Sequence, residues 1–167
     1  MPDSDIRIAY SVGRAHAQQH GQREKALAYI TRRPDELLVF AHTEDYPDSG
    51  IQVPAGGVEP GEEPADAVVR ETFEESGLKL ADPVYLGSFQ WPTEAPSRIR
   101  HFYWLQAPLD NADHWEHRVT AGQEDKGMIF RYSFAARSNP GLLPLVGFDS
   151  GLDDLERAIS EKEQVGG

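Results

Sequence analysis

The chain has 167 residues, which is enough for one domain with a substantial hydrophobic core. Its 28 Asp and Glu residues outnumber its 16 Lys and Arg residues, and the resulting net charge of −12 argues against binding to a nucleic acid polymer. The sequence contains no cysteine, which excludes disulfides, a thiol nucleophile and a cysteine zinc site.

The first ten residues, MPDSDIRIAY, do not have the basic stretch and apolar run of a signal peptide. The longest apolar runs, such as residues 37–41, are too short to cross a bilayer. We therefore expect a cytoplasmic protein with no membrane partner. Residues 1–22 are polar and their pattern predicts no particular structure. One domain is expected over residues 23–162.

The first half of that domain is predicted to contain strands and one helix. Residues 25–32 and 37–41 have strand-like patterns, and the turn between them favours a β-hairpin. Residues 51–53 predict a short strand that leads into a glycine loop. A helix is expected over residues 64–76, because Pro64 suits a first helical turn and Gly77 suits a C-terminal cap.

The second half is predicted to be mostly strands, at residues 83–91, 99–107, 115–120 and 128–134. Along 99–107 both alternating sets of side chains are bulky, which is typical of a strand that is covered on both faces. Leu152, Leu155 and Ile159 recur at helical spacing and predict a C-terminal helix. The order of elements predicts an α/β (α+β) fold with a mixed β-sheet sandwiched between helices.

The helix at 64–76 carries an unusual set of carboxylates. Glu71, Glu74 and Glu75 fall within an arc of about 100°. The opposite face is expected to be apolar and to contain Ala65, Val68, Val69, Thr72 and Phe73. Glu71 and Glu75 stand one turn apart and repel by roughly 0.2–0.5 kcal/mol. Mg²⁺ and Ca²⁺ prefer oxygen ligands, so the helix predicts a metal platform. A solvated acidic face is the alternative, but it would be expected to carry interspersed lysines, which are absent.

Residues 56–78 resemble the Nudix box. That pattern has a Gly, a Glu after five further residues and, after seven more, Arg-Glu, an aliphatic residue, any residue, Glu-Glu, any residue, Gly and an apolar residue. This chain places there Gly56, Glu62, Arg70, Glu71, Thr72, Glu74, Glu75, Gly77 and Leu78. The one departure is Thr72, whose hydroxyl can bond to the carbonyl one turn earlier, so its burial is tolerable.

The resemblance implies a Nudix fold and a known chemistry. Nudix enzymes hydrolyse a pyrophosphate bond in a nucleoside diphosphate linked to another group, and they use Mg²⁺ or Mn²⁺. It implies that Glu71 and Glu75 bind the metal directly, that Glu74 binds it directly or through water, and that the carbonyl of Gly56 is a further ligand. Glu62 and Arg70 would pair and hold the loop against the helix. Phosphoryl transfer depends mainly on positioning and charge neutralisation, which such a platform supplies. A homodimer is also expected from the resemblance.

The general base varies within the family. Glu124 lies in a loop between two predicted strands and is one candidate for a base or a further metal ligand. Its alternative is an ordinary acidic turn. Glu74 is the other candidate for the base.

Substrate contacts are harder to assign, although the partner is expected to be a phosphorylated small molecule. Aromatic and guanidinium groups stack bases and hold phosphates, which makes Arg32, Tyr46, Trp91 and Arg100 candidates. Each of them can equally have a structural role.

Three other functions are compatible with parts of the sequence. The substrate can be a non-nucleotide pyrophosphate, such as an isoprenoid or inositol compound, although few Lys and Arg residues disfavour highly phosphorylated ones. The chain can be a catalytically silent nucleotide-binding sensor, but such modules usually lose the carboxylates that are present here. An acidic calcium-binding domain fits the charge but lacks the ligand spacing of an EF-hand.

Overall fold

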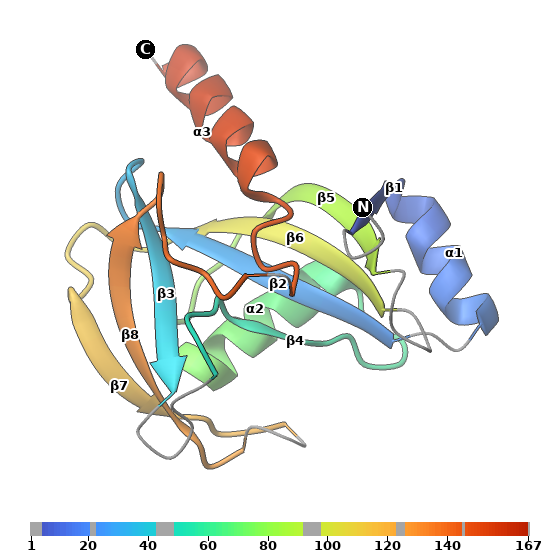
Figure 1. The fold of residues 1–167 in the computed structure, drawn as a ribbon, viewed down its shortest axis with the longest axis horizontal. Helices are drawn as coiled ribbons and strands as arrows, with labels where there is room; N and C mark the ends of the chain where they lie inside the picture. The colour runs from blue at the N-terminus through green and yellow to red at the C-terminus, as the bar shows by residue number, and fades with distance from the viewer. Residues whose placement is uncertain are drawn as a thin grey trace.

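A computed structural model describes residues 5–20, 23–42, 49–91, 98–122, 126–144 and 146–166. The elements in chain order are β1 (Ile6–Ile8), α1 (Tyr10–His20), β2 (Arg23–Thr31), β3 (Glu36–His42), β4 (Ala55–Gly57), α2 (Pro64–Ser76), β5 (Val84–Trp91), β6 (Arg98–Gln106), β7 (His114–Arg118), β8 (Ile129–Ala136) and α3 (Leu152–Gly166) (Figure 1).

The described strands form two sheets. One has five strands in the order β1-β5-β6-β2-β4, and the other has three in the order β3-β8-β7. The central pair, β2 and β6, runs parallel with Arg23 opposite Arg98 and Thr31 opposite Gln106, whereas the neighbouring pairs are antiparallel. The mixed α+β architecture with a mixed sheet is therefore confirmed.

The predicted hairpin between the first two long strands is wrong. β2 pairs with β6 and β4, whereas β3 pairs with β8 in the other sheet. Every side chain from Ala26 to Thr31 is buried, so both faces of β2 are covered, and a pattern of burial does not specify which strands pair with its edges. The strand expected at residues 51–53 is also wrong, because Ile51 and Gln52 form isolated bridges in the described chain and the strand starts at Ala55.

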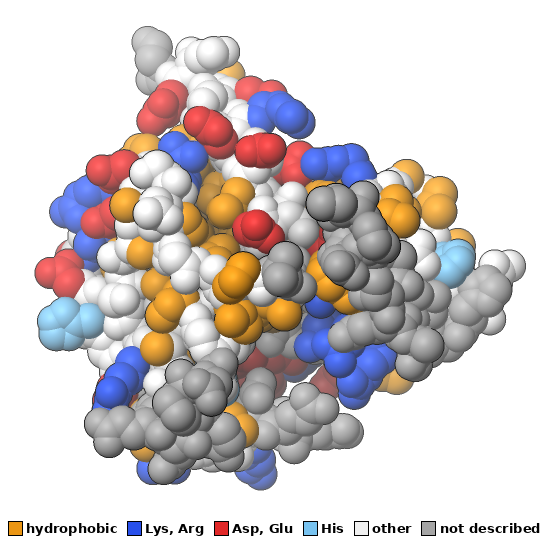
Figure 2. Space-filling model, in the orientation of Figure 1, with side chains coloured by type: hydrophobic (Ala, Val, Ile, Leu, Met, Phe, Trp, Pro, Cys, Tyr) orange, Lys and Arg blue, Asp and Glu red, His pale blue; other side chains and the backbone are white. Residues whose placement is uncertain are grey.

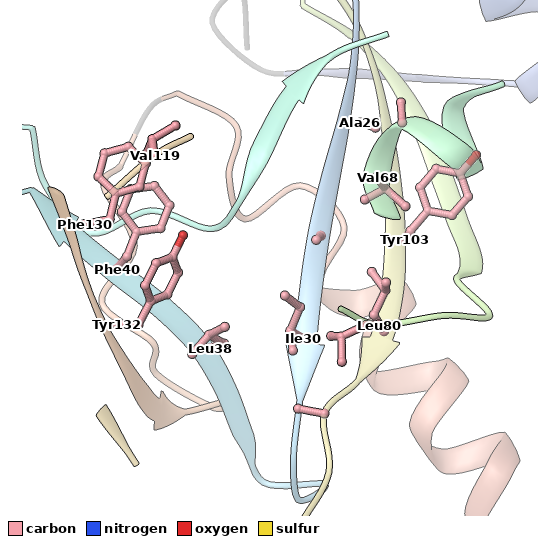
Figure 3. Packing of buried hydrophobic residues seen from close by; sticks show 14 residues of the cluster. Ala26, Ile30, Leu38, Phe40, Val68, Leu80, Tyr103, Val119, Phe130 and Tyr132 are labelled. Atoms are coloured by element: carbon pink, nitrogen blue, oxygen red, sulfur yellow. The ribbon is translucent and has the colours of Figure 1, made fainter. Parts of the chain in front are cut away.

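The alternation of side chains along β2 separates two hydrophobic clusters. Ala26, Ala28 and Ile30 belong to a cluster that includes Val68 of α2 and Tyr132 of β8. Figure 3 shows this cluster, where aromatic rings on β3 and β8 face β2. The other face of β2 joins a second cluster that includes residues of α3. β6 is buried from Ile99 to Leu105, which confirms the prediction that both faces are covered.

Residues 5–20, for which the sequence predicts no structure, form β1 and α1. β1 pairs with β5 at the edge of the five-stranded sheet, and α1 contacts β5 and β6. Gly13 allows this close approach, since a Cβ there would lie 2.9 Å from Ile8 Cδ1 and 3.1 Å from Ile99 Cγ2.

The C-terminal helix α3 is anchored near its start. Leu155 and Ile159 are buried, and the later part of the helix extends away from the sheets (Figure 1). Figure 2 shows acidic and basic side chains together along it. In the ranges that the structure describes, no helix has the length and apolar character needed to cross a membrane.

Candidate active site

Helix α2 begins and ends at the predicted residues. Pro64 occupies its first turn, and Gly77 adopts a left-handed conformation with φ of 81° while its N–H donates to Phe73 O at 2.9 Å. The predicted apolar face, however, is rotated. Phe73 is 50% exposed, whereas Glu75 is only 4% exposed. The buried arc is centred on Val68 and Thr72, and Phe73 lies about 100° from Thr72.

Arg70 connects the carboxylates of the helix to the preceding loop. Its guanidinium forms a two-pronged pair with Glu62, in which Nε and Nη2 donate to the two carboxylate oxygens at 2.9 Å each. Nη1 donates to Glu71 at 2.8 Å and to Glu74 at 3.1 Å, and Nη2 also donates to Gly57 O at 2.9 Å. The expected Glu62–Arg70 pair is therefore present, and these bonds hold the pKa of Glu62 below its usual value.

The Glu71 carboxylate lies against the glycine loop. A Cβ built on Gly56 would overlap the Glu71 carboxyl group, so residue 56 must lack a side chain for Glu71 to take this position. Burial raises the pKa of Glu71 to about 6, and Arg70 partly offsets that effect. Burial disfavours the ionised form of Glu71, and a nearby cation would stabilise that form.

Glu75 joins the helix to β4 from within the fold. Its Oε1 accepts a hydrogen bond from the Ala55 N–H at 3.2 Å, and Tyr132 on β8 donates to the Glu75 carbonyl at 2.9 Å.

The hydroxyl of Thr72, one turn away from Ser76, has no hydrogen bond to a described residue. Ser76 Oγ donates to the Thr72 carbonyl at 2.6 Å, but the Thr72 hydroxyl is buried and bonds to none of the described residues. The bond to the carbonyl one turn earlier, which the sequence allowed, is therefore not formed.

The carboxylates line a cleft of about 670 Å³. Residues of α2 and of the glycine loop line it, and so do Ala121 and Gly122. The cleft is also lined by α1 and the start of β2, which contribute Arg14, Gln18, Arg23, Glu24 and Lys25. Sequence reasoning missed these residues. The polar N-terminal segment has no distinctive pattern, and Arg23 and Lys25 look like ordinary residues at the start of a strand.

The donor set in the cleft fits a hard divalent cation. Glu71, Glu74, Glu75 and the carbonyl of Gly56 all offer oxygen, and Gly56 leaves room for the Glu71 carboxylate. Across the described ranges, no three acidic or histidine side chains are already grouped closely enough to hold a metal ion. Arg70 instead bridges Glu71 and Glu74.

The predicted substrate contacts fall in different places. Trp91 and Arg100 line a second cavity of about 260 Å³, which shares Lys25, Ala55 and Glu75 with the cleft. The Arg100 guanidinium lies 5.0 Å from the centre of the Trp91 ring and donates to a backbone carbonyl at 2.8 Å. Both side chains therefore also contribute to the packing at that position.

Arg32 lies elsewhere. It is held by two bonds to Glu36, at 2.9 and 3.0 Å, and by one bond to Asp113 at 2.6 Å, and it is not among the described residues that line either cavity. These bonds favour the structural role that the sequence left open for Arg32. Tyr46 and Glu124 lie outside the described residues.

Comparison with known proteins identifies the family. The family model described as the NUDIX domain matches residues 21–131. That is more than half of the chain, and the chain therefore belongs to the Nudix family.

Curated relatives include diphosphoinositol polyphosphate phosphohydrolase 3-beta from Bos taurus, which is 35% identical over 103 residues. The human 3-alpha protein is 36% identical over the same length. Each match covers 62% of this chain and 60% of the relative, so the similarity spans about three fifths of these proteins.

Solved structures share the fold at low sequence identity. A NUDIX hydrolase from Nitrosomonas europaea has a TM-score of 0.59 and 20% identity, and the match covers 82% of this chain and 90% of that one. A pyrophosphohydrolase from Bacillus subtilis, solved as a point mutant, has a TM-score of 0.59 and 15% identity, with 95% of this chain and 90% of that one covered.

Proposed function

We propose that this protein is a divalent-metal-dependent hydrolase that cleaves a pyrophosphate bond in a phosphorylated small molecule. The observation that carries the proposal is the complete Nudix motif folded at one cleft, where Arg70 links Glu62, Glu71 and Glu74. The curated relatives are named as phosphohydrolases, which supports the same reaction class.

Each acidic residue has a proposed role in this reaction. Glu71, Glu74 and Glu75 would hold Mg²⁺ or Mn²⁺ with the carbonyl of Gly56, and Arg70 keeps the carboxylates beside the loop. A bound cation would neutralise negative charge and polarise the phosphoryl group that is attacked. Glu74 is a candidate to accept the proton of the attacking water, and Glu124 remains a second candidate.

Two substrate classes are compatible with this site. The first is a nucleoside diphosphate linked to another group, as the resemblance implies. The second is a diphosphorylated inositol polyphosphate, which the names of the relatives favour. Arg14, Arg23 and Lys25 line the same cleft as the carboxylates, so basic side chains that can hold phosphates are present there despite the net charge of the chain.

A substrate panel tests the proposal. Purified protein would be assayed for product formation on nucleoside triphosphates, nucleotide sugars, ADP-ribose, dinucleoside polyphosphates and diphosphoinositol phosphates, with Mg²⁺ and then Mn²⁺. We expect turnover that a chelator abolishes and that Glu75→Gln lowers by on the order of 10²-fold or more. The identity of the best substrate would choose between the two classes.

The matched control is Glu161→Gln, which removes one carboxylate from the exposed surface of α3. It should retain full turnover. Unchanged metal-dependent turnover in Glu75→Gln would contradict the mechanism. Ligand-induced thermal shifts without turnover on any panel member would favour the nucleotide-binding sensor instead.

A further inference from the structure

Helix α1 contributes to the cleft although it precedes the residues that match the NUDIX domain. The match begins at residue 21, whereas Arg14, Ala17 and Gln18 of α1 line the cleft. Gly13 brings the helix against the sheet, because a Cβ at this position would press on Ile8 and Ile99. The element that precedes the matched domain is therefore part of the site.

Arg14 is held in this position by an ion pair. Its Nη1 donates to Glu24 Oε1 at 3.0 Å, and the Arg14 side chain retains 20% exposure. Glu24 is at the start of β2 and also lines the cleft. The pair thus joins α1 to the central sheet and keeps the guanidinium beside the cleft.

A chain of buried groups supports Glu24 from behind. Glu24 Oε2 lies 2.8 Å from His101 Nε2, and His101 Nδ1 lies 2.7 Å from Ser88 Oγ. Ser88 Oγ in turn lies 2.6 Å from the hydroxyl of Tyr85, which is exposed at the surface. His101 and Ser88 are fully buried, and the Tyr10 ring of α1 packs on His101 with centroids 5.1 Å apart.

The hydrogen bonds in this chain run in one direction. A carboxylate accepts hydrogen bonds, so His101 Nε2 donates to Glu24. Burial lowers the pKa of His101 and favours the neutral ring, whose Nδ1 then accepts from the Ser88 hydroxyl. Ser88 Oγ is thereby free to accept from Tyr85. Each group fixes the orientation of the next, and the series ends at the carboxylate that holds Arg14.

We propose that Arg14 binds a phosphate group of the substrate, and that Tyr85, Ser88, His101 and Glu24 act as positioning residues for it. A guanidinium that is oriented in advance is well suited to phosphate, because its planar donors match two phosphate oxygens. Arg14 lines the same cleft as the proposed metal ligands, so a substrate bound there would bring a phosphate within reach of its guanidinium. The conclusion that this phosphate belongs to the substrate rests on the proposed function.

Binding of inorganic tripolyphosphate without added metal tests the role of Arg14, because no turnover is needed. We expect Arg14→Gln to weaken binding at least about tenfold in a calorimetric titration, and Arg14→Lys to retain part of the affinity. The matched control, Arg131→Gln, removes an equally charged side chain from an exposed pair with Glu116 on β7 and β8 and should leave the affinity unchanged. Equal affinity of Arg14→Gln and wild type, or no binding by the wild type, would overturn the inference.

The positioning role has its own test. Ser88→Ala removes the bond to His101 and should weaken tripolyphosphate binding about threefold to tenfold. If it acts through Arg14, the same substitution in an Arg14→Gln background should change the affinity no further, although both proteins melt at a lower temperature than their parents. An equal fold-loss in both backgrounds would show that Ser88 has a merely structural role.

Turnover separates this inference from the proposed function. Arg14-dependent phosphate binding without hydrolysis of any panel member would contradict the proposed function and leave Arg14 as a phosphate ligand. Hydrolysis of a panel member, with unchanged KM and unchanged phosphate affinity in Arg14→Gln, would support the proposed function. It would contradict the role of Arg14 as a phosphate ligand.

Discussion

The carboxylate of Glu71 on α2 lies against the backbone of Gly56 on β4, in the space that a Cβ at residue 56 would fill. Gly57, the next residue, has open space around the same position, and neither glycine has a positive φ. Residue 56 must therefore be glycine because a side chain there would overlap the Glu71 carboxylate. The same constraint does not apply to residue 57.

Gly56→Ala should therefore impair the site much more than the fold. The added methyl group would push the Glu71 carboxylate away, and a displacement of about 1 Å can lower a rate on the order of 10²-fold. We expect a loss of that size in kcat/KM, measured with Mg²⁺ on the best substrate of the panel. Gly57→Ala is the matched control and should retain activity. Similar activities of the two variants would show that this contact is unimportant.

Arg70→Lys should disrupt the loop and the carboxylates together. The guanidinium of Arg70 donates to Glu62, Glu71 and Glu74, and an ammonium group cannot reproduce that geometry. We expect at least about a tenfold decrease in kcat/KM and about 1–2 kcal/mol less free energy of unfolding, measured by urea denaturation.

The corresponding control for Arg70→Lys is Arg131→Lys, because Arg131 forms an exposed pair with Glu116. Exposed pairs contribute about 0–1 kcal/mol, so little change is expected there. Equal effects of the two substitutions would mean that the Arg70 contacts do not hold the site together.

Local signals allowed the most accurate predictions from the sequence. Pro64 and Gly77 specify the ends of α2 through their own backbone preferences, and the motif places Glu62 in reach of Arg70. The pairing of β2 with β6 could not be read in this way, because the two strands are far apart in the sequence and burial alone does not identify partners. The contribution of α1 was also missed, since it depends on Gly13 fitting against Ile99.

Thr72→Val should stabilise the protein. The Thr72 hydroxyl is buried without a hydrogen bond to any described residue, and an unpaired buried polar group costs about 1–3 kcal/mol. Valine has a similar shape and restores the aliphatic residue that the motif prefers. We expect a gain of about 1 kcal/mol in the free energy of unfolding, measured by urea denaturation.

Thr72→Ser is the comparison for that gain, because it keeps the hydroxyl and removes the methyl group. It should lower the stability, since the buried methyl is lost while the polar atom remains. If Thr72→Val is no more stable than the wild type, the hydroxyl has a partner that this structure does not show.

His101 should make the stability of the protein depend on pH. Burial lowers its pKa in the folded state, while Glu24 opposes that shift and the nearby Arg14 adds to it. The uncharged groups that face the ring are Ser88 and Tyr10. The unfolded chain therefore takes up a proton first as the pH falls below about 6.5, and the stability that His101 contributes is lost as the pH falls toward its folded-state pKa.

The measurement is urea denaturation of wild type and His101→Gln between about pH 7.5 and 5, an interval that spans the usual histidine pKa of about 6.5. The wild type should lose more free energy of unfolding than His101→Gln over this interval, because glutamine does not titrate. His114→Gln, which removes an exposed histidine from β7, should follow the wild type. If His101→Gln and the wild type lose stability in parallel, the ring is not held neutral between Glu24 and Ser88, and the one-directional chain that orients Arg14 would be wrong as well.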